Sequence, residues 1–186
     1  MTTVSFTDAD GTDRDILFRQ YVSDPLVVQT IPGQTIRLQV RGRETLATQD
    51  MFLTWSVKVV SEDGGTVRGT LASIRRDGTE LDTVLTNRGD SAPADSITLQ
   101  SRDRLVFEIG TGGDPLVSHD TDLSIGDDNA TDLPQNDTET SAFNPWIELG
   151  ATLTFDVPTA QLAAAWGLLY GEVVEQGASA AGGARE

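Results

Sequence analysis

His119 is the first residue to consider for catalysis, because it is the only histidine in the chain and hydrolytic triads need a general base. Its neighbours Ser118 and Asp120 are adjacent in sequence, whereas a triad gathers its members in space. The chain has no cysteine, which excludes a thiolate nucleophile and a zinc–thiolate site. These residues form no catalytic constellation, so we predict no catalytic residue.

Carboxylates in a polar segment could bind a cation through their oxygens. The candidates are Asp120, Asp122, Asp127 and Asp128. An EF-hand loop that began at Asp120 would need a glycine at position 125 and an acidic residue at 131, where Ile125 and Thr131 stand. An EF-hand is therefore excluded. The four aspartates remain candidates for a looser cation site, while the prediction is that no metal or other cofactor is bound.

The charge of the chain limits its partners. Its 186 residues carry 29 acidic and 13 basic side chains, a formal net charge of −16, and Lys58 is the only lysine. Such a surface repels nucleic acid and anionic lipid headgroups, so we predict no nucleic-acid partner. Aspartate outnumbers glutamate by 20 to 9, which favours a protein adapted to a high-salt cytoplasm, where counterions screen the repulsion. An acidic mesophilic protein is the alternative.

The most regular hydrophobic pattern lies at Ile147–Val157, where apolar and polar residues alternate for eleven positions. This period of two is typical of a strand with one face on a core and one in water. Further apolar segments with turn residues between them predict more strands, at residues 16–18, 26–31, 34–41, 51–60, 66–76, 79–86, 96–100 and 105–109. Phe52 and Val60 add apolar groups to the second face of 51–60, which predicts a central strand.

About eight strands at intervals near ten residues predict an all-β fold, a single jelly roll or antiparallel β-sandwich with one short C-terminal helix. We expect one domain over residues 1–176. Within it, residues 110–144 are rich in Gly, Asp, Asn and Thr and predict a long acidic surface loop. Residues 160–175 have apolar side chains at helical spacing, and residues 177–186 form a small-residue tail that we expect to be mobile.

Large apolar residues near the C-terminus are the candidate interface. They are Trp146, Trp166, Leu169 and Tyr170. Aromatic side chains bury much area with little loss of rotamer entropy, so they often anchor contacts between proteins. The alternative is that the terminal helix closes the end of its own sandwich, and the sequence is compatible with both roles.

The whole pattern resembles the smaller major capsid protein of the tailless icosahedral haloarchaeal viruses with an internal membrane, the sphaerolipovirus type. Size, the β class, the acidic Asp-rich surface, the missing catalytic constellation and the apolar C-terminal helix support this resemblance. It implies a virion capsid protein that assembles with itself and with a second, larger jelly-roll protein into capsomers. It also allows proximity to an internal membrane, although no segment of the chain is long and apolar enough to span one.

Two other functions stay open at this point. One is a haloarchaeal β-sandwich binding module for sugar or a divalent cation, which would use the long acidic loop. The other is a glycosidase with dispersed carboxylates, since its acid and nucleophile can come from any part of a sequence. The first residues show neither a cationic nor an apolar run, so we expect no secretory signal and synthesis in the host cytoplasm.

Overall fold

The structure, a computed structural model, describes residues 2–8, 12–113, 118–125, 131–132 and 143–156. All regular secondary structure in these residues is β-strand, which confirms the predicted all-β class. One sheet contains β1 (Thr2–Asp8), β4 (Gln34–Glu44), β7 (Thr86–Ala94), β10 (His119–Ile125) and β13 (Trp146–Leu149). The other contains β2 (Arg14–Val22), β5 (Met51–Val60), β6 (Val67–Ile74) and β9 (Arg104–Gly113).

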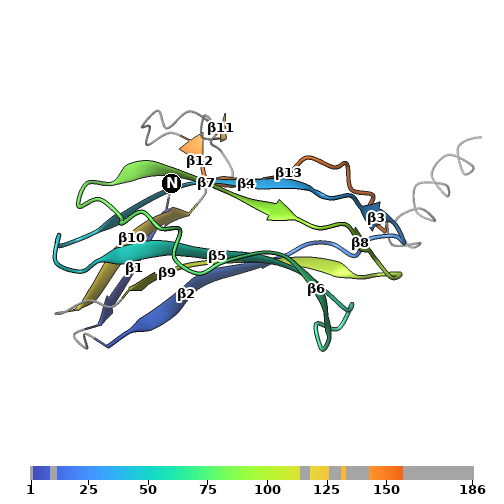
Figure 1. Cartoon of the computed structure of the whole chain (residues 1–186), viewed down its shortest axis with the longest axis horizontal. Helices are drawn as coiled ribbons and strands as arrows, with labels where there is room; N and C mark the ends of the chain where they lie inside the picture. Colours follow the sequence, from blue (N-terminus) through green and yellow to red (C-terminus); the bar gives the residue numbers. More distant parts are fainter. Residues whose placement is uncertain (1, 9–11, 114–117, 126–130, 133–142, 157–186) are drawn as a thin grey trace, which may run out of the picture.

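Four short strands form two further pairs. They are β3 (Thr30–Ile31) with β8 (Ile97–Thr98), and β11 (Thr131–Asp132) with β12 (Phe143–Asn144). Figure 1 shows the two main sheets as layers, with β4 and β13 in the upper layer and β5 and β9 in the lower one. We call these layers the β4 sheet and the β5 sheet.

The strand order is that of a jelly roll. The main strands pair in order from the two ends of the chain towards its middle. These pairs, all antiparallel, are β1 with β10, β2 with β9, β4 with β7 and β5 with β6. Two more ladders, β10 with β4 and β9 with β5, join these pairs into sheets ordered β1-β10-β4-β7 and β2-β9-β5-β6. The chain is therefore one long antiparallel hairpin rolled into a sandwich, with four of its main strands in each sheet and β13 added to the β4 sheet, which confirms the jelly-roll prediction.

The core lies between the sheets and follows the predicted alternation. On β5 the inward side chains Leu53, Trp55 and Val57 are at most 3% exposed, and β5 lies between β9 and β6 as the pattern predicted. Two polar contacts also cross the core. Trp55 Nε1 donates to Asp90 Oδ2 on β7 at 2.6 Å, and the hydroxyls of Thr111 and Thr121 lie 2.9 Å apart. These contacts satisfy buried polar groups and fix the sheets relative to each other.

The predicted loop over residues 110–144 is wrong in two places. Its start belongs to β9, and residues 119–125 form β10, an interior strand of the β4 sheet. β10 pairs with residues 41–44 of β4, and β13 pairs with residues 36–39 along the same edge. β10 and β13 therefore lie one after the other along the same edge of β4. The sequence pattern did not reveal β10 because, among its residues whose burial is described, Leu123 is the one apolar residue in the core and the outward residues are polar.

The predicted strand Ile147–Val157 is shortened to β13. Ile147 and Leu149 pack on the core as expected, but Leu149 already pairs with Ile36, near the start of β4. Before Ile36, β4 has only the two residues Gln34 and Thr35, so the ladder with β13 ends here. The Gln34 side chain instead accepts a hydrogen bond from the Ala151 amide at 2.9 Å, and the chain turns towards residues 25–29.

Other differences involve edge strands. In the predicted strand over residues 79–86, Thr86 begins β7, and residues 79–85 make only an isolated bridge, between Glu80 and Phe52. Residues 87–94, which lie between two of the predicted strands, form most of β7. β7 pairs only with β4, and an edge strand tolerates Pro93, which lacks an amide donor. β1 was also missed, although its Val4 and Phe6 pack on the core.

The predicted C-terminal helix, residues 160–175, and the tail, residues 177–186, lie outside the described residues. In the part of the chain that the structure describes, no helix is long and apolar enough to cross a membrane.

Candidate interaction face

The outer face of the β5 sheet carries two adjoining hollows of about 360 and 410 Å³. Lys58 and Glu108 line both hollows and form the boundary between them. One hollow continues towards Leu17 and Gly110, and the other towards Val22 and Val67. We call this surface, with the residues that line the two hollows, the β5 face.

A polar cluster forms the centre of the β5 face. Lys58 on β5 makes an ion pair with Glu108 on the neighbouring strand β9. Glu108 also accepts hydrogen bonds from Ser56 Oγ and Gln20 Nε2, both at 2.9 Å. Chiefly because Lys58 donates to it, the pKa of Glu108 is lowered from its ordinary value. The only lysine of the chain is therefore paired within this face.

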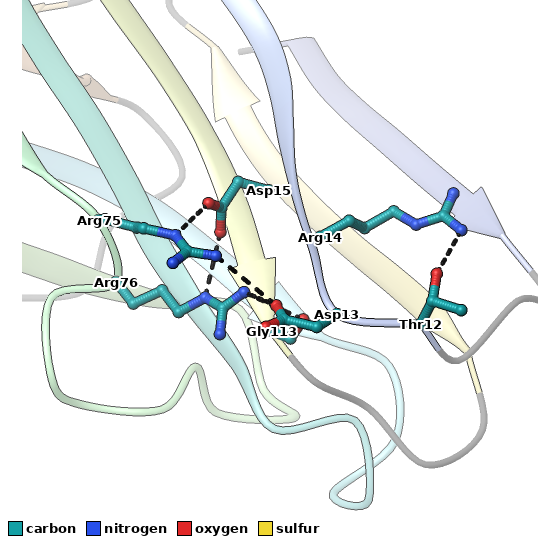
Figure 2. A network of polar contacts seen from close by, with 7 residues as sticks. All are labelled: Thr12, Asp13, Arg14, Asp15, Arg75, Arg76 and Gly113. Atoms are coloured by element: carbon teal, nitrogen blue, oxygen red, sulfur yellow. Dashed lines mark hydrogen bonds and ion pairs between the residues drawn. The ribbon is translucent and has the colours of Figure 1, made fainter.

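One end of the face is closed by a strap of side chains that crosses the sheet (Figure 2). Arg75, which follows β6, donates from Nε to Asp15 Oδ2 on β2 at 2.5 Å, although β6 and β2 are opposite edges of this sheet. The contact passes over β9 at Gly112, which has no side chain and so leaves space for it. A Cβ atom at Gly112 would lie 2.0 Å from Asp15 Oδ1. A side chain at this position would displace the Asp15 carboxylate from the strap.

Arg76 strengthens the same end of the face. It donates to Asp15 Oδ1 at 3.1 Å and to Asp13, and its Nη2 also reaches the Gly113 carbonyl at 3.3 Å (Figure 2). Burial works to lower the pKa of Arg76, but the hydrogen bonds that it donates to Asp13 and Asp15 outweigh this effect and the pKa is raised. Both arginines thus have carboxylate partners, while the Arg75 side chain stays 67% exposed.

The other end of the face is apolar with an acidic rim. Val22, Val60, Val67 and Val106 line its hollow. Val22 and Val67 are 54% and 57% exposed. The rim is the β5–β6 turn, where Glu62 Oε1 lies 2.5 Å from Arg102 and Asp63 accepts from Ser61 Oγ at 2.6 Å.

The β5 face is close to neutral in a strongly acidic protein. Its lining includes the three cations Lys58, Arg75 and Arg104 and the four carboxylates Asp15, Glu62, Asp63 and Glu108, a net charge of −1. The whole chain carries −16. Exposed apolar groups on a neutral surface are features of a contact site rather than of a solvated one.

The predicted cation candidates take part in structural contacts where they are described. The Asp122 carboxylate accepts hydrogen bonds from Ser5 Oγ at 2.5 Å and from Arg43 Nε at 2.7 Å, so both of its oxygens are used. Asp120 accepts from Thr7 on β1. Asp127 and Asp128 lie outside the described residues. Within the described ranges, no three His, Asp or Glu side chains are grouped as metal ligands would be.

Of the predicted interface residues, Trp146 is the one that the structure describes. It is half-buried on β13 and pairs with Gln39 on the outward side of the β4 sheet. Trp166, Leu169 and Tyr170 lie outside the described residues, so the interface they predict remains a prediction. His119 begins β10, where its backbone pairs with that of Asp8.

Sequence patterns did not predict the β5 face. The available signal was the apolar Val60 on the polar side of β5, which indicated that this side is partly covered. The pairing that brings Val22 and Val106 into the same surface depends on β2 lying beside β9, a contact between residues far apart in the sequence.

No protein-family model and no curated protein matches the chain. Among solved structures, a VP2 subviral particle of infectious bursal disease virus matches 66% of this chain and 31% of its own, with 12% identity and a TM-score of 0.32. The virus structure of the Gx strain matches 82% of this chain and 37% of its own, with 15% identity and a TM-score of 0.36. The Eiger TNF of S. frugiperda matches 59% of this chain and 68% of its own, with 15% identity and a TM-score of 0.25.

The chain spans about a third of the length of the viral chains that it matches. These neighbours are structures of a virus and of a subviral particle, and at these scores they assign the chain to no family.

Proposed function

We propose that this chain is a structural subunit of a virion, a major capsid protein that assembles into capsomers of an icosahedral shell in concentrated salt. The observation on which this rests is an eight-stranded jelly roll whose outer face combines exposed valines with near-neutral charge. Such a subunit would contact copies of itself and a second, larger jelly-roll protein, as the resemblance to haloarchaeal viral capsid proteins implies.

Salt is part of the proposal because the remaining surface is acidic. At least seven basic side chains in the described residues already make ion pairs within the chain, and the net charge of −16 remains after all 13 basic residues are counted. Copies packed side by side would repel each other. At about 1 M salt the Debye length falls to roughly 3 Å, from about 10 Å at 0.1 M, which removes repulsion beyond direct contact.

A sugar-binding module is less well supported by the two hollows of the β5 face. Sugar sites usually offer an exposed aromatic platform. Trp55 is the one aromatic residue among those that line the hollows, and it is 3% exposed because it belongs to the core. A surface of valines and paired charges suits contact with another protein better.

We expect oligomers or shell fragments of the purified chain in KCl at about 1 M or more, and their dissociation on dialysis to about 0.1 M, as repulsion between acidic surfaces returns. Sedimentation velocity at both salt concentrations measures this change. Circular dichroism on the same samples shows whether the subunit itself stays folded. An oligomeric state that does not depend on salt would contradict the proposal.

A further inference from the structure

We propose that the β5 face is self-complementary and binds the same face of a second copy about a two-fold axis. This inference rests on the proposed function, because it names the surface through which copies of the subunit meet. A two-fold contact uses one surface on both partners, so every feature of the surface must match its own rotated copy.

The charges of the face satisfy this requirement. Lys58 and Glu108, shared by the two hollows, mark its centre. A two-fold axis through this centre places the acidic turn of one copy, Glu62 and Asp63, over the arginine end of the other. There Arg75 is 67% exposed, although it also pairs with Asp15. At both ends an exposed carboxylate thus meets an exposed arginine, although Glu62 also pairs with Arg102 in its own chain, and the ion pair at the centre is neutral.

The apolar residues supply an attraction between two copies, which the net negative charge of the chain opposes. Leu17, Val22 and Val67 on this face are each more than half exposed. Removing such groups from water is favourable by about 25 cal/mol per Å², and salt does not screen this attraction. A second copy is the favoured occupant because a near-neutral face adds no repulsion when it meets itself, even in a chain of net charge −16.

The size of the face predicts a weak contact. Four strands about 4.8 Å apart and eight residues of about 3.3 Å give roughly 500 Å² per copy. The total of roughly 1,000 Å² is at the lower limit for a specific interface. A contact of this size would be weak for an isolated dimer, and it suits a shell in which each subunit makes several contacts at once.

Val67→Asp tests the inference, because it places one charge on each side of the two-fold contact. We expect self-association at least about tenfold weaker than in the wild type, measured by sedimentation equilibrium in KCl at about 1 M. Val84→Asp is the matched control, since Val84 is 60% exposed but does not line the β5 face. Thermal melts of both variants verify that the monomers are folded.

A charge exchange tests the two-fold arrangement. Arg75→Glu and Glu62→Arg should each weaken association, and the double variant should recover most of it, because the exchanged charges meet across the axis. Wild-type association that Val67→Asp leaves unchanged would overturn this face while the proposed function stands. Weakening by both single changes without recovery in the double variant would overturn the two-fold arrangement. A wild-type chain that stays monomeric at every salt concentration would overturn both proposals.

Discussion

Gly110→Ala is expected to destabilise the fold by about 3 kcal/mol or more, a large fraction of the roughly 5–15 kcal/mol by which a typical domain is stable. A Cβ atom at Gly110 would lie 1.8 Å from the carbonyl oxygen of Ile16. Backbone occupies this space because β2 has a bulge here. Leu17 pairs with Gly110 and Arg19 pairs with Ile109, which leaves Phe18 as an extra residue that enters the core.

Chemical denaturation of the variant and the wild type measures this effect. Gly65→Ala is the control, since its Cβ would meet only the Asp63 side chain, at 3.3 Å or more, in an exposed turn. That control should change the free energy of unfolding by less than about 1 kcal/mol. A Gly110→Ala variant as stable as the control would show that β2 and β9 do not approach each other as described.

Glu44→Gln is expected to stabilise the fold at pH 8 and to remove a pH dependence. The Glu44 side chain is 1% exposed. Burial, with the nearby Glu80 and Asp50 carboxylates, raises its pKa from 4.5 to about 7, although the Met51 amide donates to it at 3.1 Å. Glutamine can accept the same bond from Met51 and can donate to Glu80 in place of the proton that the carboxyl pair shares.

The sign of the pH effect follows from the raised pKa. Between about pH 4.5 and 7 the folded chain holds a proton on Glu44 that the unfolded chain has lost, so the free energy of unfolding falls as pH rises through this range. The fall at this site is at most about 3 kcal/mol, and it is complete above pH 7. Glu148→Gln, the same change at an exposed position on β13, is the control. Parallel pH profiles for the wild type and Glu44→Gln would contradict the burial of this carboxyl.

The strands that cover the core could be predicted because their alternation is long. β4 and β5 each have apolar residues at three or more successive alternate positions, and the structure buries those residues. β10 and β1 could not be predicted in the same way. Their outward polar residues bond to each other across the ladder, as Ser5 does to Asp122, so their polarity resembled that of a loop.

The β5 face could not be predicted because it depends on pairing rather than on local pattern. Lys58 and Glu108 are 50 residues apart, and their contact exists because β5 and β9 are neighbours in the sheet. The bulge at Phe18 and the strap from Arg75 to Asp15 are likewise settled by the approach of distant backbones. The sequence showed apolar residues on the mainly polar side of residues 51–60. This indicated that the side is partly covered, but not which residues or which protein would cover it.

Electron microscopy of the purified chain in KCl at about 1 M, with the same sample after desalting, shows whether the chain is a shell subunit. The account predicts curved lattices or closed shells of regularly spaced subunits in salt, and their loss at about 0.1 M, where the Debye length returns to about 10 Å. A monomer at every protein and salt concentration, or aggregates without a regular lattice, would contradict the account of this chain as a shell subunit.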